Sequence, residues 1–225
     1  KRRQEVAQIR DYYAQLHRLD SVAFRIRTAN RADCQDWVSA QIGLYAATPR
    51  SLPRRFRSFS AEALNMTWAR PTAISVVEGS PAASAGIISG DEIIALNGEL
   101  IPVTGTAGWI GGWLKANGER PVQVNLRRHG EDMTRTVQPV MGCAIPINLE
   151  TNPEPNAFTD YKKIVIQSGM LRLTRTDAEV LDQLVGVEAE RVPVGDLQDA
   201  AAGLGAVETQ ALRGLAAQDD VLEDG

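Results

Sequence analysis

The sequence predicts an α+β fold in which short strands and short helices alternate with tight turns. Residues 79–98 carry a dense series of turn and helix-cap signals. Residues 122–126 alternate apolar and polar side chains as a half-buried strand does, and residues 134–140 follow as its partner. Apolar side chains recur at helical spacing in residues 6–19 and 106–116. The chain of 225 residues is long enough for one or two domains with cores of their own.

The N-terminal part is predicted to contain a helix followed by a strand. The apolar face of the helix is formed by Val6, Ile9, Tyr13, Leu16 and Leu19. Residues 21–28 then alternate, with Val22, Phe24 and Ile26 on one side, which predicts a strand.

A cap signal and a stop signal delimit a short helix further along the chain. Residues 73–77 are apolar and β-branched, which predicts a strand before this helix. Ser80 can cap a helix, and Pro81 suits the first helical position. Gly86 permits the left-handed conformation in which helices commonly end.

A buried strand and a hairpin follow this short helix. Residues 93–96 are apolar and predict the strand. Asn97-Gly98 is the strongest two-residue hairpin signal that a sequence offers. The helix predicted at 106–116 comes next.

The order of these signals resembles a PDZ domain of the bacterial kind. That family shows a strand, then Gly-Ser-Pro-Ala-x-x-Ala-Gly, Gly-Asp-x-Ile and Asn-Gly, and here the resemblance covers residues 58–140. It implies that an extended peptide, often a C-terminus, binds as an added strand beside one helix. That helix is 106–116, so the implied peptide-binding residues are Ile110, Trp113 and Leu114.

One element of that family is not recognisable in the sequence. Its carboxylate loop usually carries a Gly-Φ-Gly-Φ pattern just before the first groove strand, whereas residues 53–70 contain no glycine. Arg54, Arg55 and Arg57 lie there and could hold a carboxylate by charge. Such a cluster is more often a solvated edge. The sequence therefore leaves open whether C-terminal peptides bind.

A second series of short motifs follows in residues 156–181. It consists of Asn156-Ala157-Phe158, an apolar strand at 163–167, a Gly169-Met170-Leu171 turn and a helix start at Thr176 with Glu179 in the capping-box position. This order resembles the HtpX-like zinc metallopeptidases, the group related to the CAAX prenyl protease. In that family the strand pairs with substrate backbone, which implies Ile164, Val165 and Ile166 as further peptide-binding residues.

This second resemblance implies the domain organisation. Residues 58–140 are the PDZ-like insert, and the peptidase-like domain contributes 1–57 before it and a zincin-like strand and helix block at 141–191 after it. An Ala/Leu-rich helical tail, 192–225, ends the chain. Some periplasmic family members carry two cysteines around such an insert. A periplasmic or otherwise extracytoplasmic location is therefore expected, with a bridge between Cys34 and Cys143; the alternative is two buried free thiols.

The zinc motif of that family is absent from this sequence. In His-Glu-x-x-His, two imidazoles bind zinc and the glutamate activates a bound water. The expected histidines fall on Gly186 and Glu190, and the expected glutamate falls on Val187. The chain has only His17, expected at the surface, and His129, expected in a turn. No catalytic residue, metal ligand or cofactor is therefore expected in this chain. Zinc is expected only if the missing helix exists elsewhere.

Other acidic residues near these positions do not make a catalytic zinc site. Glu188, Glu190 and Asp196 offer only oxygen ligands, which suit calcium or magnesium better. Their spacing matches no calcium loop, so a solvated helix face is expected.

Composition narrows the function classes further. The net charge of −4 does not favour a nucleic-acid partner, and no run of about 18 apolar residues predicts a membrane span. The chain begins with Lys1-Arg2-Arg3, without methionine or a signal sequence, so a mature or trimmed product is expected. Three hypotheses remain. The first is an inactive or incomplete metallopeptidase-family protein that binds peptide or unfolded protein segments. The second is an active zinc metalloendopeptidase whose zinc helix is missing from this chain, and the third is a plain PDZ interaction module.

Overall fold

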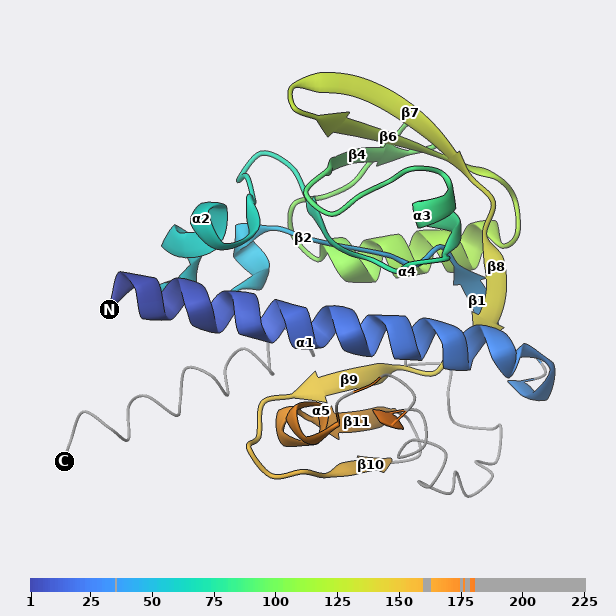
Figure 1. The fold of residues 1–225 in the computed structure, drawn as a ribbon. Coiled ribbons are helices and arrows are strands. Elements are labelled where there is room, and N and C mark those ends of the chain that lie inside the picture. Colours follow the sequence, from blue (N-terminus) through green and yellow to red (C-terminus); the bar gives the residue numbers. More distant parts are fainter. Residues whose placement is uncertain (35, 160–162, 175, 177–178, 181–225) are drawn as a thin grey trace. The chain divides into compact units, whose positions relative to one another are not determined.

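The computed structural model in Figure 1 divides into two units between residues 144 and 145, and the units are described separately. The structure describes residues 1–34, 36–159, 163–174, 176 and 179–180. The predicted tail at 192–225 lies outside the described residues.

The first unit begins with one long helix, α1 (Arg2–Ala29), shown in blue in Figure 1. The strand predicted at 21–28 is therefore wrong. Val22 and Ile26 are four residues apart, so the same short alternation also satisfies the helical period and extends the apolar face. The helix ends at Asn30, whose backbone N–H and side-chain amide both donate to the Ile26 carbonyl, at 3.1 and 2.8 Å.

An antiparallel sheet, the main sheet, forms the body of this unit. The strand order is β2-β3-β4-β6-β7, and β5 pairs with β4 beside this path. The strands are β2 (Leu44–Ala47), β3 (Thr72–Val76), β4 (Glu92–Leu96), β5 (Glu99–Leu100), β6 (Val122–Arg128) and β7 (Glu131–Val137). β2 belongs to the same sheet as β3, although it lies before residue 58, where the sequence analysis began the PDZ-like segment.

Two helices, α3 (Pro81–Ser84) and α4 (Thr106–Asn117), complete the core around the main sheet. Ile93, Leu96 and Leu126 are fully buried in this core, together with Ile110 and Leu114 of α4. Apolar burial of this kind stabilises the folded state by roughly 25 cal/mol per Å² removed from water.

The turn and cap signals of the sequence are confirmed. The Ser80 hydroxyl accepts a hydrogen bond from the Ala83 N–H at 3.3 Å, which caps α3. Asn97 and Gly98 have φ values of 47° and 84° and join β4 to β5. His129, with φ at 51°, occupies the turn between β6 and β7 as expected.

A buried carboxylate ties the turn before β4 to the end of β6. Asp91 is 1% exposed, and its oxygens accept two hydrogen bonds from the Arg128 guanidinium at 2.7 and 2.8 Å. Asp91 also accepts the Ile88 N–H at 3.0 Å. The pKa of Arg128 is raised by this hydrogen bond to Asp91. The aspartate of the Gly-Asp pair therefore has a structural role.

Three short helical segments connect β2 to β3. They are η2 (Pro49–Ser51), η3 (Arg54–Phe59) and α2 (Ser60–Leu64). Leu52 and Phe56 are 1% and 0% exposed and fix this connection to the unit. Arg10 of α1 donates to the Ala63 and Glu62 carbonyls of α2 at 3.3 and 2.9 Å.

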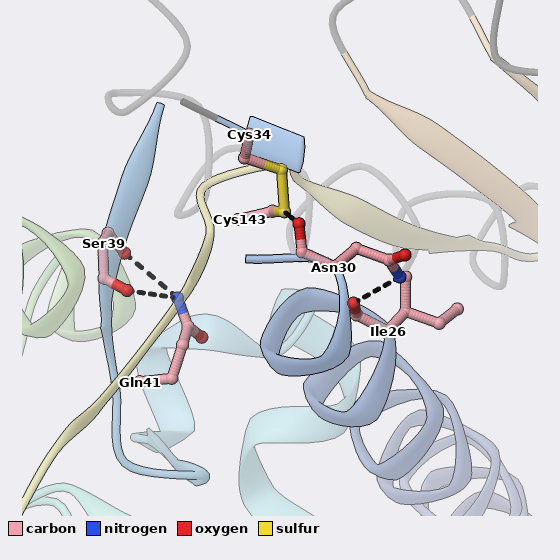
Figure 2. The surroundings of a disulfide bond; sticks show 6 residues. All are labelled: Ile26, Asn30, Cys34, Ser39, Gln41 and Cys143. Atoms are coloured by element: carbon pink, nitrogen blue, oxygen red, sulfur yellow. Dashed lines mark hydrogen bonds between the residues drawn. A yellow bond between two sulfur atoms is a disulfide. The ribbon is translucent and has the colours of Figure 1, made fainter. Parts of the chain in front are cut away.

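The two ends of the domain lie side by side. Strand β1 (Val38–Gln41) pairs antiparallel with β8 (Val140–Cys143) in a separate two-stranded sheet. Cys34, in η1 (Arg31–Cys34), is bonded to Cys143, with 5.6 Å between the Cα atoms (Figure 2). The predicted bridge is thus present in the structure, and Gly142 leaves room for Arg27 of α1 to approach β8 closely.

The second unit contains a small sheet of three strands. Its strands are β9 (Ile147–Glu150), β10 (Ala157–Thr159) and β11 (Ile164–Gln167), and helix α5 (Ser168–Leu173) follows. β11 lies in the centre, antiparallel to β10 and parallel to β9. The predicted capping box also forms, because the Thr176 hydroxyl accepts the Glu179 N–H and the Glu179 carboxylate accepts the Thr176 N–H.

Substitution of Asp91 by alanine is expected to destabilise the protein by about 2–4 kcal/mol, because it removes a buried carboxylate that accepts from the Ile88 N–H and from the Arg128 guanidinium. Urea unfolding measures the change. Asp132→Ala is the matched control, because Asp132 pairs with the neighbouring Arg127 at the surface. A loss of stability as large in the control as in Asp91→Ala would contradict this role.

Removal of the disulfide by Cys34→Ser together with Cys143→Ser is expected to lower the free energy of unfolding by about 2–4 kcal/mol, because the bridge restricts a long loop in the unfolded chain. The two cysteines are 109 residues apart. Urea unfolding of the double variant and of the wild type, each with and without reductant, measures the effect. Equal stability of the oxidised wild type and the double variant would contradict the prediction.

Candidate functional site

Strand β2 forms one edge of the main sheet. It pairs with β3 on one side, and no strand of the described residues pairs with its other side. The unpaired edge of a strand presents backbone N–H and C=O groups that can accept a further strand.

The register shows which backbone groups face this open edge. Gly43 O accepts the Val77 N–H at 2.9 Å, so the next residue, Leu44, directs its N–H and C=O away from β3. Ala46 lies opposite Ala73. The Ala73 N–H donates to Asp91 O and the Ala73 carbonyl accepts the Gly90 N–H, so both backbone groups of Ala73 point to the β4 side and away from β2. Ala46 therefore also presents its N–H and C=O at the open edge.

Helix α4 lies against β2 and β1. The side chains of Leu44 and Ala46 join Ile110, Trp113 and Leu114 in one apolar cluster. The structure thus brings the three residues predicted on this helix next to β2. They are 5%, 8% and 6% exposed, so they form the floor of the site and belong to the core at the same time.

Trp113 has one feature that packing alone does not require. Its indole Nε1–H is buried and has no hydrogen-bond partner among the described residues. A buried donor without an acceptor costs free energy, and a ligand carbonyl or carboxylate would relieve that cost.

The turn that leads into β2 is fixed by its backbone. Ile42 O accepts the Ala82 N–H at 2.9 Å, and Gly43 has φ at 68°. A Cβ atom at Gly43 would overlap Ser80, so only glycine fits. This glycine turn directly precedes β2, whereas the sequence analysis looked for a carboxylate loop at residues 53–70. The available signal was Gly43-Leu44-Tyr45, with one glycine in place of the usual two.

The opposite face of β2 is covered by α1. Arg27 donates to the Tyr45 hydroxyl at 3.4 Å, and both Arg27 and Asp20 are buried. Burial, together with a smaller effect of the nearby Asp20, raises the pKa of Tyr45 to about 12. His17, expected at the surface, instead lies partly buried with Nδ1 2.8 Å from the Ser75 hydroxyl on β3.

The far end of β2 is tied to the segment that leads into α4. The Thr48 hydroxyl donates to Val103 O at 2.9 Å and accepts the Arg50 N–H at 3.2 Å. The arginine cluster lies beyond this point, after β2 rather than before it. Arg57 donates to two carbonyl groups of its own turn, those of Leu52 and Arg50. Arg54, Arg55 and Arg57 therefore follow β2 in the chain and do not precede it.

The other predicted peptide-binding residues lie on a strand without an open edge. Ile164 and Ile166 of β11 pair with β9 on one side and β10 on the other, as does Val165. Both hydrogen-bonding sides of this strand are occupied within its own unit. The addition of a substrate strand to these residues, implied by the peptidase resemblance, is not available in this structure.

No metal centre is present in the part of the chain that the structure describes. None of its His, Cys, Asp and Glu residues gather in groups of three or more that could hold a metal ion. The positions at which the zinc motif was expected, and the acidic residues Glu188, Glu190 and Asp196, lie outside the described residues. Within the described residues, no helix is both long and apolar enough to cross a membrane.

Comparison with known proteins agrees with this geometry. Residues 73–128 match the family model described as a PDZ domain. The chain contains a PDZ domain. The match spans β3 to β6, so β2 is placed in the PDZ sheet by its pairing with β3. No curated protein matches the chain.

Solved structures that match part of the chain include two from HtrA-type proteins. One is the HtrA3 PDZ domain bound to a phage-derived ligand, FGRWV, with 20% identity over 46% of this chain and 88% of that one, and a TM-score of 0.36. Another is the HtrA-type protease AlgW with a decapeptide, with 17% identity over 46% of this chain and a TM-score of 0.35. This chain spans 30% of the length of that protease.

The raised pKa of Tyr45 predicts a loss of stability in alkali. Above pH 10 the unfolded chain loses the phenol proton before the folded protein does, so stability is retained below pH 10 and falls as the pH rises towards 12. Urea unfolding at several pH values between 8 and 11 measures this slope. Tyr45→Phe is expected to show a shallower slope above pH 10, and equal slopes would contradict the assignment.

Proposed function

We propose that the protein binds extended segments of peptide or unfolded protein by adding them as a strand to β2. The observation that carries the proposal is the open edge of β2, where Leu44 and Ala46 present unpaired N–H and C=O groups beside α4. PDZ domains bind extended peptides in this way, with main-chain hydrogen bonds giving affinity and side-chain contacts giving specificity. The match of residues 73–128 to the PDZ family supports the assignment.

In this proposal the ligand pairs antiparallel with β2 over a short stretch. β2 spans Leu44–Ala47, so about four ligand residues would pair with it at ~3.4 Å per residue. The ligand backbone would bond to Leu44 and Ala46, and the Trp113 indole would donate to it or to its terminal carboxylate. The Ile42-Gly43 turn lies at the end where a ligand's C-terminus would be held.

The substitution Ala46→Pro tests this mode of binding. Proline removes the backbone N–H at the open edge, whereas the bonds between β2 and β3 do not involve that group. We expect binding of a fluorescent decapeptide pool, randomised in its last four positions, to fall at least tenfold. Fluorescence anisotropy measures binding, and circular dichroism checks that the variant is folded. Undiminished binding by the folded variant would contradict the proposal.

A second pair of variants tests the indole donor. Trp113→Phe keeps an aromatic ring but removes the N–H, and we expect about threefold to tenfold weaker binding from one lost hydrogen bond. Trp109→Phe is the matched control on the same helix. Parallel measurements with free and amidated C-termini show whether a terminal carboxylate is required. Equal effects of the two tryptophan variants would exclude a special role for Trp113.

We also propose that the second unit is a peptidase-like scaffold without a zinc site. Support comes from the observed order of β10, β11, α5 and the Thr176–Glu179 capping box, together with the absence of His-Glu-x-x-His from the sequence. Metal content and intact mass, measured on the same sample, test the proposal. One zinc per chain with chelator-sensitive hydrolysis of an unfolded protein, or a mass several kilodaltons above the sequence, would favour an active metalloendopeptidase.

The Cys34–Cys143 bridge supports an extracytoplasmic location for this function. Disulfides persist in oxidising compartments such as the bacterial periplasm and are rare where thiols are kept reduced.

A further inference from the structure

An exposed aromatic and cationic pair lies just past the end of β2. Arg50 is exposed, and its guanidinium lies 5.7 Å from the centre of the Trp68 ring. The Trp68 side chain is 52% exposed, which is unusual for a large apolar group. Both residues are close in sequence to the terminal pair of the β2–β3 ladder, Ala47 and Thr72. Tryptophan and arginine are the residue types that most often dominate binding surfaces.

The segment around this pair carries positive charge without acidic residues. Residues 46–61 contain four arginines and neither Asp nor Glu. Arg50 and Arg54 are exposed. Glu62, the next acidic residue along the chain, pairs with Arg2 at 2.7 Å.

The arginine segment is held in one conformation by its own contacts. Arg57 donates to Leu52 O and Arg50 O at 3.0 and 3.2 Å, and Thr48 caps the turn that contains Arg50. Leu52 and Phe56 anchor the same turn in the core. The exposed Arg50 and Arg54 are therefore presented from a fixed backbone, which lowers the entropy lost on binding.

We propose that Arg50, whose guanidinium lies against the exposed Trp68 ring, binds acidic side chains of the ligand, upstream of the residues that pair with β2. This inference rests on the proposed strand addition and names the ligand class of that site. A ligand antiparallel to β2 has its C-terminal end beside Leu44 and its N-terminal part beyond Ala47. That part leaves the strand past Thr48 and meets Arg50. The preferred ligand is therefore a peptide with Asp or Glu residues immediately before a strand-forming end.

Two decapeptide pools test this specificity. Both have the last four positions randomised, and the preceding six are Asp/Glu-rich in one pool and Asn/Gln-rich in the other. We expect the acidic pool to bind about threefold to tenfold more tightly at 50 mM salt, because each exposed ion pair contributes little by itself. The preference is expected to shrink at 500 mM salt, where the charges are screened.

Single substitutions show which residues produce the preference for the acidic pool. Arg50→Ala and Trp68→Ala are expected to remove most of the preference, so that the affinities for the two pools differ by no more than about twofold. Arg127→Ala, which removes an exposed positive charge on β6, is the matched control and is expected to retain the preference.

Three results would contradict this proposal, each in a different part. Equal affinity for the two pools would refute the acidic preference and leave strand addition standing. A preference lost equally in Arg127→Ala and Arg50→Ala would refute its location at Arg50. Failure of both pools to bind would refute the proposed function, and the preference with it.

Discussion

The open edge of β2 is the constraint on which the arrangement of the first unit depends. An edge strand lacks half of its ladder, so it must be held by contacts other than hydrogen bonds to a second neighbour. Here Leu44 and Ala46 pack towards α4, and Tyr45 meets Arg27 of α1 on the other face. Gly43 and Thr48 fix the two ends. The strand is thus kept in place while its outward N–H and C=O groups stay available.

Sequence reasoning was most successful where structure follows from local backbone chemistry. The Ser80 cap, the Asn97-Gly98 hairpin, the turn at His129 and the capping box at Thr176 each involve only a few adjacent residues, so the signal is complete within the motif. The strand predicted at 21–28 was wrong because three alternating apolar residues also fit a helix, and the preceding turns of α1 decide between the two.

The candidate site was harder to predict because an edge is a property of pairing. β2 is four residues long and its side chains carry no distinctive pattern, so nothing local marks it as the strand beside α4. β11 has the stronger apolar and β-branched sequence, yet it lies in the centre of its sheet and offers no free side. Ile110, Trp113 and Leu114 were correctly placed on α4, because helical periodicity identifies the face of a helix that turns to the core.

The bridge between Cys34 and Cys143 also determines how the chain carries mechanical load. A pull on α1 against residues beyond Ala144 is transmitted from one cysteine to the other through a covalent bond. The 109-residue separation between them is bypassed, so the strands of the PDZ domain bear none of that tension. The open edge of β2 lies within this bypassed segment, so its backbone carries no load when the flanking parts of the chain are stretched.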